Sequence, residues 1–133
     1  MKHSVMLTIA PLLLILFLTF HLADDIVRGF EPGGLSNLVV GVLISVIWLY
    51  GTLVLAERRS GYIITLLLSL FSLVVPYVHM SGAKGVGLAS RLAGTSGHLL
   101  FVWTLLAIGV LSLFSVILCV RGLWRLPWRR QPG

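Results

Sequence analysis

The chain has 133 residues, of which 58% are hydrophobic and 11% are charged, and it carries a formal net charge of +6 at pH 7. A soluble domain of this size could not bury so much apolar surface in its own interior, so the composition excludes one and requires lipid to solvate the remainder. The only cysteine, Cys119, cannot form a disulfide within the chain, which argues against the thiol oxidoreductases that also use four membrane helices.

Four runs without a charged residue dominate the sequence, at about residues 4–23, 35–56, 61–80 and 99–120. Each is about 20 residues long, which as an α-helix is enough to cross a hydrocarbon layer of about 30 Å. We therefore predict an all-α fold, in which residues 1–133 form a single polytopic transmembrane four-helix bundle.

The first run follows Lys2, as the apolar core of a secretory signal would, but it is longer than such a core. His21 stands near its end, where a signal peptidase site needs small residues, so an uncleaved helix is predicted. The helix ends with His21, Asp24 and Asp25, whose i, i+3, i+4 spacing places the three side chains on one face. A simpler role for either carboxylate is an ion pair with Arg28, about one turn further on.

The second run carries Asn37, Gly41 and Ser45 on one face. It leads through the short charged segment 57–61 into the third run, so these two helices are expected to be antiparallel neighbours. Small and polar residues on one face are typical of helix contacts within a membrane, where lipid gives helices no hydrophobic reason to associate.

The third run carries a polar face that passes through Ser72 and ends at His79. Pro76 lies on the same face and has no backbone N–H, so it leaves the Ser72 carbonyl without its helical partner. We expect this proline to bend the helix just below His79 and to open the bundle there.

The fourth run begins beside His98, and residues 121–133 follow it as a tail in which tryptophan alternates with arginine. This composition is typical of an anchor at the membrane interface, where indole rings lie among the headgroups and cations are attracted to anionic lipid. The residues of this interfacial anchor are Trp124, Arg125, Trp128, Arg129 and Arg130. Because a membrane explains these charges, no nucleic-acid partner is expected.

The distribution of charge predicts the topology. With the N-terminus in the cytoplasm, the inner side of the membrane carries seven Lys and Arg residues against Glu57 alone, whereas three basic residues balance three acidic ones on the outer side. This is the positive-inside pattern, so both termini are predicted to be cytoplasmic. The expected location is the lipid bilayer of a bacterial inner membrane.

Polar residues would then gather at one depth, at the extracytoplasmic ends of the helices. They are His21, Asp24, Asp25, Asn37, His79 and His98. Three imidazoles with one or two carboxylates suit a borderline cation, so we predict a zinc or iron site whose ligands are His21, His79, His98 and Asp24 or Asp25. Asn37, Ser72 and Arg28 would support these ligands. Haem held axially by His79 and His98 is a narrower form of the same prediction.

Three functions are compatible with these residues. The first is a small redox or hydrolytic membrane enzyme, or a subunit of one, that acts on a lipid-soluble or periplasmic substrate. The second is a non-catalytic subunit that packs against a larger membrane complex or self-associates through the face of Asn37, Gly41 and Ser45. The third is a proton-coupled carrier in which His21 and Asp25 relay a proton. The polar residues could equally be ordinary residues of the membrane interface, because polarity at helix ends costs little.

Overall fold

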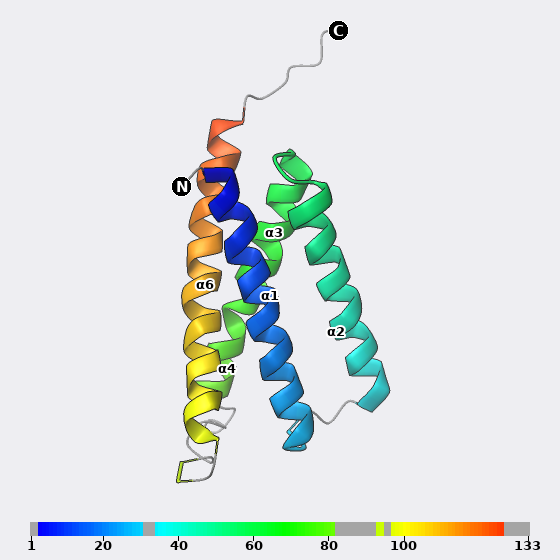
Figure 1. Cartoon of the computed structure of the whole chain (residues 1–133), viewed down its shortest axis with the longest axis vertical. Helices are drawn as coiled ribbons and strands as arrows, with labels where there is room; N and C mark the ends of the chain where they lie inside the picture. The colour runs from blue at the N-terminus through cyan, green and yellow to red at the C-terminus, as the bar shows by residue number, and fades with distance from the viewer. Residues whose placement is uncertain (1–2, 31–33, 82–92, 95–96, 127–133) are drawn as a thin grey trace, which may run out of the picture.

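The computed structural model describes residues 3–30, 34–81, 93–94 and 97–126, and every regular element within these ranges is helical. The main helices are α1 (His3–Val27), α2 (Gly34–Leu49), α3 (Arg59–Ser72), α4 (Val74–Ser81) and α6 (His98–Arg125) (Figure 1). A π-helical turn, η1 (Tyr50–Val54), continues α2. The predicted all-α fold is therefore confirmed for the described part of the chain.

Four helical segments are long and apolar enough to cross a membrane. They are Ser4–Val27, Gly34–Val54, Arg59–Ser81 and His98–Arg125, and they coincide with the four predicted runs. The first segment begins and the last segment ends at the same end of the bundle (Figure 1). The cytoplasmic location of that end stays a prediction from the charge distribution.

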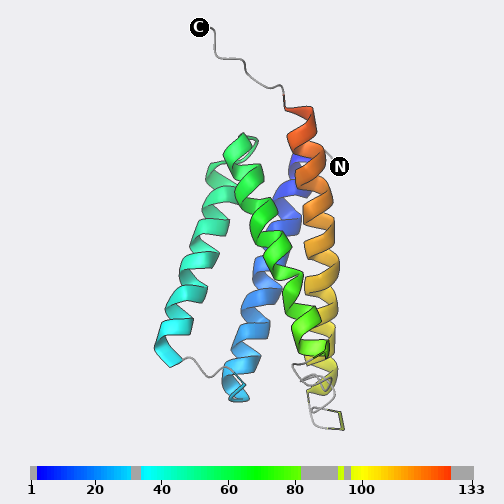
Figure 2. The same cartoon turned by 180° about the vertical axis from the view of Figure 1, so that it is seen from behind.

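Helix α6 is the centre of the closely packed part of the molecule. It lies against α1 on one side and against α3 and α4 on the other (Figures 1 and 2). Phe101 and Ile108 of α6 and Leu14 of α1 are completely buried in these contacts. Near the end of α6, Gly122 lies so close to the ring of Tyr62 that a Cβ atom at position 122 would overlap it. A small residue thus allows α3 and α6 to approach, as is common between helices in a membrane.

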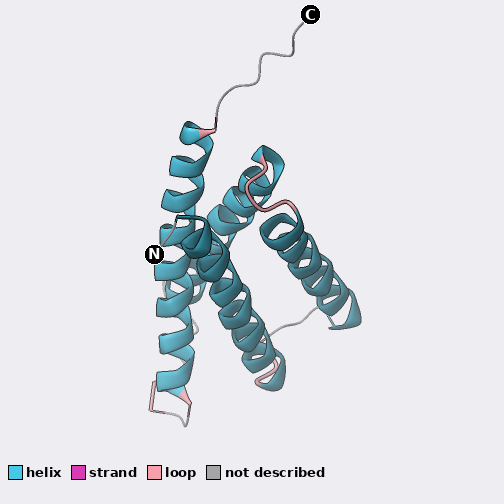
Figure 3. Ribbon diagram, turned by 45° about the horizontal axis from the view of Figure 1, so that its top comes forward, coloured by secondary structure: helices cyan, strands magenta, loops and turns pink. Residues whose placement is uncertain are grey.

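Helix α2 packs much less closely than the other spanning helices. Trp48 is the one buried residue within Gly34–Leu49, and α2 stands apart from α1 over much of its length (Figures 1 and 3). A near approach occurs at Gly41, where a Cβ atom would lie 3.2 Å from Leu22 of α1. The face of α2 that carries Gly41 and Ser45 is consequently turned toward α1 of the same chain.

The third spanning segment is interrupted at Leu73, between α3 and α4. The Leu73 N–H still donates to the Ser69 carbonyl at 3.3 Å, whereas Pro76 has no N–H to offer the Ser72 carbonyl. The interruption therefore falls at the turn that Pro76 was expected to disturb. It separates α4, which carries His79, from the more regular α3.

Part of the predicted interfacial anchor is described. Helix α6 ends at Arg125, and Trp124 in its last turn is 84% exposed. Trp128, Arg129 and Arg130 lie outside the described residues. Contact of this segment with lipid headgroups stays a prediction.

Candidate metal centre

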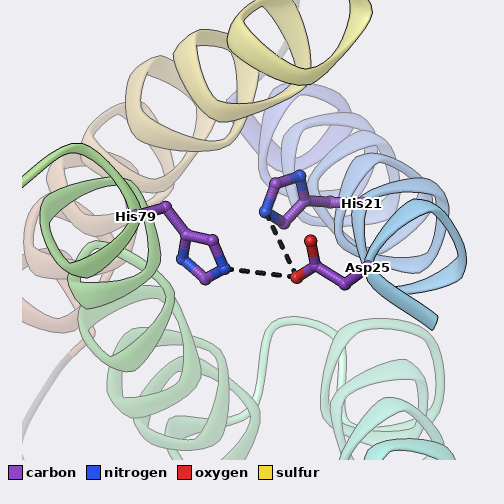
Figure 4. Close-up of side chains that lie close together, drawn as sticks. All are labelled: His21, Asp25 and His79. Carbon is purple, nitrogen blue, oxygen red and sulfur yellow. Dashed lines mark hydrogen bonds and ion pairs between the residues drawn. The ribbon is translucent and has the colours of Figure 1, made fainter. Parts of the chain in front are cut away.

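His21 and Asp25 of α1 and His79 of α4 come together at one end of the bundle (Figure 4). One ligand atom from each residue lies within 4.8 Å of the other two. His79 Nε2 is 3.2 Å from Asp25 Oδ2, and His21 Nε2 is 3.7 Å from the same oxygen. The two imidazoles thus face a single carboxylate oxygen from different helices.

The surroundings of these three groups exclude most solvent. His21 is 3% exposed and Asp25 is 6% exposed. The ring of Phe101, on α6, packs 4.9 Å from the ring of His21 and 6.0 Å from that of His79, measured between centroids. The two imidazoles meet edge to face at 4.9 Å. A charged group in such a position needs a close partner of opposite charge or a metal ion.

The orientation of His79 is fixed by its own helix. Its Nδ1 atom lies 2.9 Å from the carbonyl oxygen of Val75, one turn earlier. Because a carbonyl only accepts hydrogen bonds, Nδ1 carries a proton and donates it. In a neutral imidazole the lone pair then belongs to Nε2, which is the atom that faces Asp25.

The orientation of His21 follows from a contact with α6. The hydroxyl of Thr104 donates to the Phe101 carbonyl at 2.9 Å, so its oxygen is left to accept a hydrogen bond from His21 Nδ1 at 3.1 Å. This assignment of the tautomer, inferred from the hydrogen-bond network, puts the lone pair of the neutral ring on Nε2. His21 Nε2 and Asp25 Oδ1 have no hydrogen-bond partner among the described residues.

Three electron-pair donors therefore converge on one point. A proton on His79 Nε2 can form a hydrogen bond to Asp25 at 3.2 Å. It leaves His21 Nε2 without a partner among the described residues. A metal ion would accept an electron pair from all three groups. Histidine ligands of metal ions in proteins usually donate their other ring N–H to an oxygen acceptor, as His21 and His79 both do.

Other residues predicted for this site lie elsewhere. Asp24 Oδ2 accepts a hydrogen bond from Arg28 Nε at 2.8 Å, because the i, i+4 spacing brings the two side chains together on one face of α1. Arg28 also lies against Gly97, just before α6. His98 is the first residue of α6 and is outside the group of three, since the face of α6 at the site is formed by Phe101 and Thr104.

The two remaining residues that were predicted to support the ligands are Asn37 and Ser72. Asn37 is exposed in the first turn of α2. Ser72 is buried, and its hydroxyl lies 2.6 Å from that of Ser112 on α6. Thr104 and Phe101 were not expected at the site. Their positions could have been predicted from Ser112 and Ser115, because helical spacing places all four residues on one face of α6, which is buried.

A cavity of about 570 Å³ adjoins the three groups. His21, Asp25 and His79 form part of its wall, and the rest comes from α1, α2 and the segment around Leu73. The cavity lies beside α2 where this helix stands apart from α1 (Figure 1).

Comparison of the chain with protein-family models, curated proteins and solved structures finds no match. The function must therefore be argued from the residues of the site.

Proposed function

We propose that this protein is an integral membrane metal-binding protein, with His21 Nε2, His79 Nε2 and a carboxylate oxygen of Asp25 as ligands. The observation that carries the proposal is that both imidazoles are oriented in the same way. Each donates Nδ1–H to an oxygen, and each presents Nε2 to Asp25. This arrangement leaves three donors, two of them on buried residues, for one cation.

The distances are near those that a small divalent ion requires. Ligand bonds of about 2.0–2.1 Å place tetrahedral ligand atoms about 3.3 Å apart. The observed separations from Asp25 Oδ2 are 3.2 Å and 3.7 Å, while the widest separation within the group is bounded by 4.8 Å. Binding an ion would draw the imidazoles of α1 and α4 together by a small rotation of their side chains.

Two imidazoles and one carboxylate support zinc or non-haem iron(II) as the resident metal. Catalytic zinc sites keep three protein ligands and an open position, and non-haem iron oxygenases use two histidines and a carboxylate. Either ion with an open position can act as a Lewis acid, and iron can also carry redox chemistry. Haem held by His79 and His98 fits less well, because His79 Nε2, the nitrogen left for a metal, is turned toward Asp25 Oδ2 at 3.2 Å.

The proposal is tested by elemental analysis of protein purified in a non-ionic detergent without chelators. The variants are His79→Ala and, as the matched control, His98→Ala, which removes a histidine at the same end of the bundle but outside the group. We expect about one ion per chain in the parent and in the His98→Ala protein, and less than a tenth of that in His79→Ala. Circular dichroism shows whether each variant is folded.

The same assay separates the alternatives. A folded parent protein without metal contradicts the proposal and leaves a proton as the cation shared by the group, which would favour a proton-coupled carrier. Equal metal loss in both variants would also contradict the ligand assignment. A non-catalytic subunit requires no metal and predicts that neither variant changes the composition of the protein.

A further inference from the structure

The cavity beside the three proposed ligands is long as well as large. Its wall follows α1 from Ile15 to Ile26 and α2 from Leu38 to Trp48. At a rise of 1.5 Å per residue, these stretches are each about 15 Å long. The cavity therefore extends from His21 and Asp25 toward the middle of the bundle, and its volume of about 570 Å³ is within the usual range for small-molecule sites.

The wall is mostly apolar; its polar groups are the proposed ligands at one end and the indole of Trp48, whose Nε1 has no hydrogen-bond partner among the described residues. Three hydroxyl residues also line it, but their hydrogens are already donated within their own helices. Thr19 donates to the Ile15 carbonyl at 2.8 Å, Ser45 to the Gly41 carbonyl at 2.9 Å, and Ser72 to the Ser69 carbonyl at 2.9 Å. A molecule in the cavity would thus meet mostly hydrocarbon along its length, with two imidazoles and a carboxylate gathered at one end.

The cavity lies on the loosely packed side of the molecule, next to α2. Many residues of this helix are exposed, and the side of the molecule on which α2 stands apart from α1 would face the lipid of a membrane (Figure 1). A molecule dissolved in the bilayer could enter sideways between α1 and α2 without first crossing into water.

The charge of the proposed metal centre determines which head group such a molecule needs. If a divalent ion is bound as proposed, the charge of Asp25 cancels only half of its charge, and Asp24 is already paired with Arg28. A buried centre with one net positive charge is costly unless an anion completes it. A carboxylate can do so, because it neutralises the remaining charge and is a good oxygen ligand for zinc or iron.

We propose that the cavity binds a long-chain carboxylate from the membrane, with its head on the metal at the open position and its chain between α1 and α2. This inference names the ligand class of the same site and therefore rests on the proposed function for its head group. The chain-binding part depends on the cavity alone. The two parts can be tested separately.

The probe is palmitate, added to protein in non-ionic detergent whose metal has been replaced by cobalt(II). The visible spectrum of cobalt(II) changes when a ligand is added to its coordination sphere. We expect palmitate to change this spectrum with a stoichiometry of one, while hexadecane, which has the chain but no head, leaves it unchanged. Hexadecanol should bind at least tenfold more weakly than palmitate, because a neutral head leaves the charge uncompensated.

The cavity is blocked by Ser45→Trp, since Ser45 lies in its wall. The matched control is Leu43→Trp, which places the same ring on α2 at a position that is 56% exposed and does not line the cavity. We expect Ser45→Trp to keep its metal and to weaken palmitate binding at least tenfold, and Leu43→Trp to behave like the parent.

The outcomes distinguish this inference from the proposed function. If Ser45→Trp keeps its metal and still binds palmitate like the parent, the ligand inference is wrong and the metal centre stands. If neither the parent nor any variant binds metal, the proposed function is wrong. The site for the hydrocarbon chain would still be supported if the parent binds labelled palmitate and Ser45→Trp abolishes that binding. The inference is also wrong if the parent binds metal but no palmitate. It is likewise wrong if a second copy of the chain fills the cavity in a dimer.

Discussion

The contact between α3 and α6 is closely packed, whereas the region between α1 and α2 is loosely packed. Along the α3–α6 contact, Gly122 brings the backbones together and the Tyr62 ring lies on the glycine. Between α1 and α2, the helices come near each other at Gly41, and a cavity lies between them. Since lipid can solvate apolar side chains as well as protein does, loss of close packing on one side exposes little to water. The loose side is therefore where a binding site can form at small cost to folding.

The largest expected effect comes from removing the metal, because the proposed ion would link α1 to α4 across the loosely packed side. A ligand that binds only the folded protein stabilises it by about 4 kcal/mol when its free concentration is about 1,000 times its Kd. We expect a chelator to lower the thermal unfolding midpoint of the parent protein, measured by circular dichroism in detergent. The His98→Ala protein should respond in the same way.

The His79→Ala protein gives the control for that experiment. Without a complete ligand set, its unfolding midpoint should already be low and should not move when the chelator is added. A chelator effect of equal size in His79→Ala would show that the stabilising metal binds elsewhere in the chain.

A smaller effect is expected from the closely packed side, where two glycines of α6 form a matched pair. In Gly122→Ala the new methyl group would overlap the Tyr62 ring, so overpacking should reduce the free energy of unfolding by about 1–3 kcal/mol. In Gly109→Ala the methyl group would lie 3.6 Å from Pro76, an ordinary contact, and the better helix propensity of alanine should raise stability by up to about 1 kcal/mol. Denaturant titrations in one detergent compare them; equal effects would contradict the packing argument.

The sequence predicts the membrane-spanning helices better than it predicts the site. The four spans follow from charge-free runs of about 20 residues, because desolvation of charge dominates every other term in a hydrocarbon layer. His21 and Asp25 were identifiable as a pair from their i, i+4 spacing on one helix. Their relation to His79 depends on how α1 and α4 pack, which no spacing within one helix can determine.

The rotation of α6 about its axis shows the same limit. The buried face of α6 includes Phe101 and Thr104, which contact His21 although the sequence pattern did not single them out. In lipid both faces of a helix are apolar, so hydrophobic periodicity hardly separates the buried face from the exposed one. His98, the first residue of α6, is six residues from Thr104, and the sequence does not give which of these levels along the helix lies beside His21.

The smallest expected effect concerns the hydroxyl contact between Ser72 and Ser112, 2.6 Å apart and completely buried between α3 and α6. Hydrogen bonds between membrane helices contribute about 0.6 kcal/mol on average, because each partner finds other acceptors when it is lost. A double-mutant cycle with Ser72→Ala and Ser112→Ala should therefore give a coupling free energy of about that size. Ser72 already donates to the Ser69 carbonyl, so its hydrogen is shared between two acceptors or is supplied to one of them by Ser112. A coupling above about 2 kcal/mol would mean that this contact, rather than Gly122, holds α3 against α6 and would reverse the comparison between the two sides.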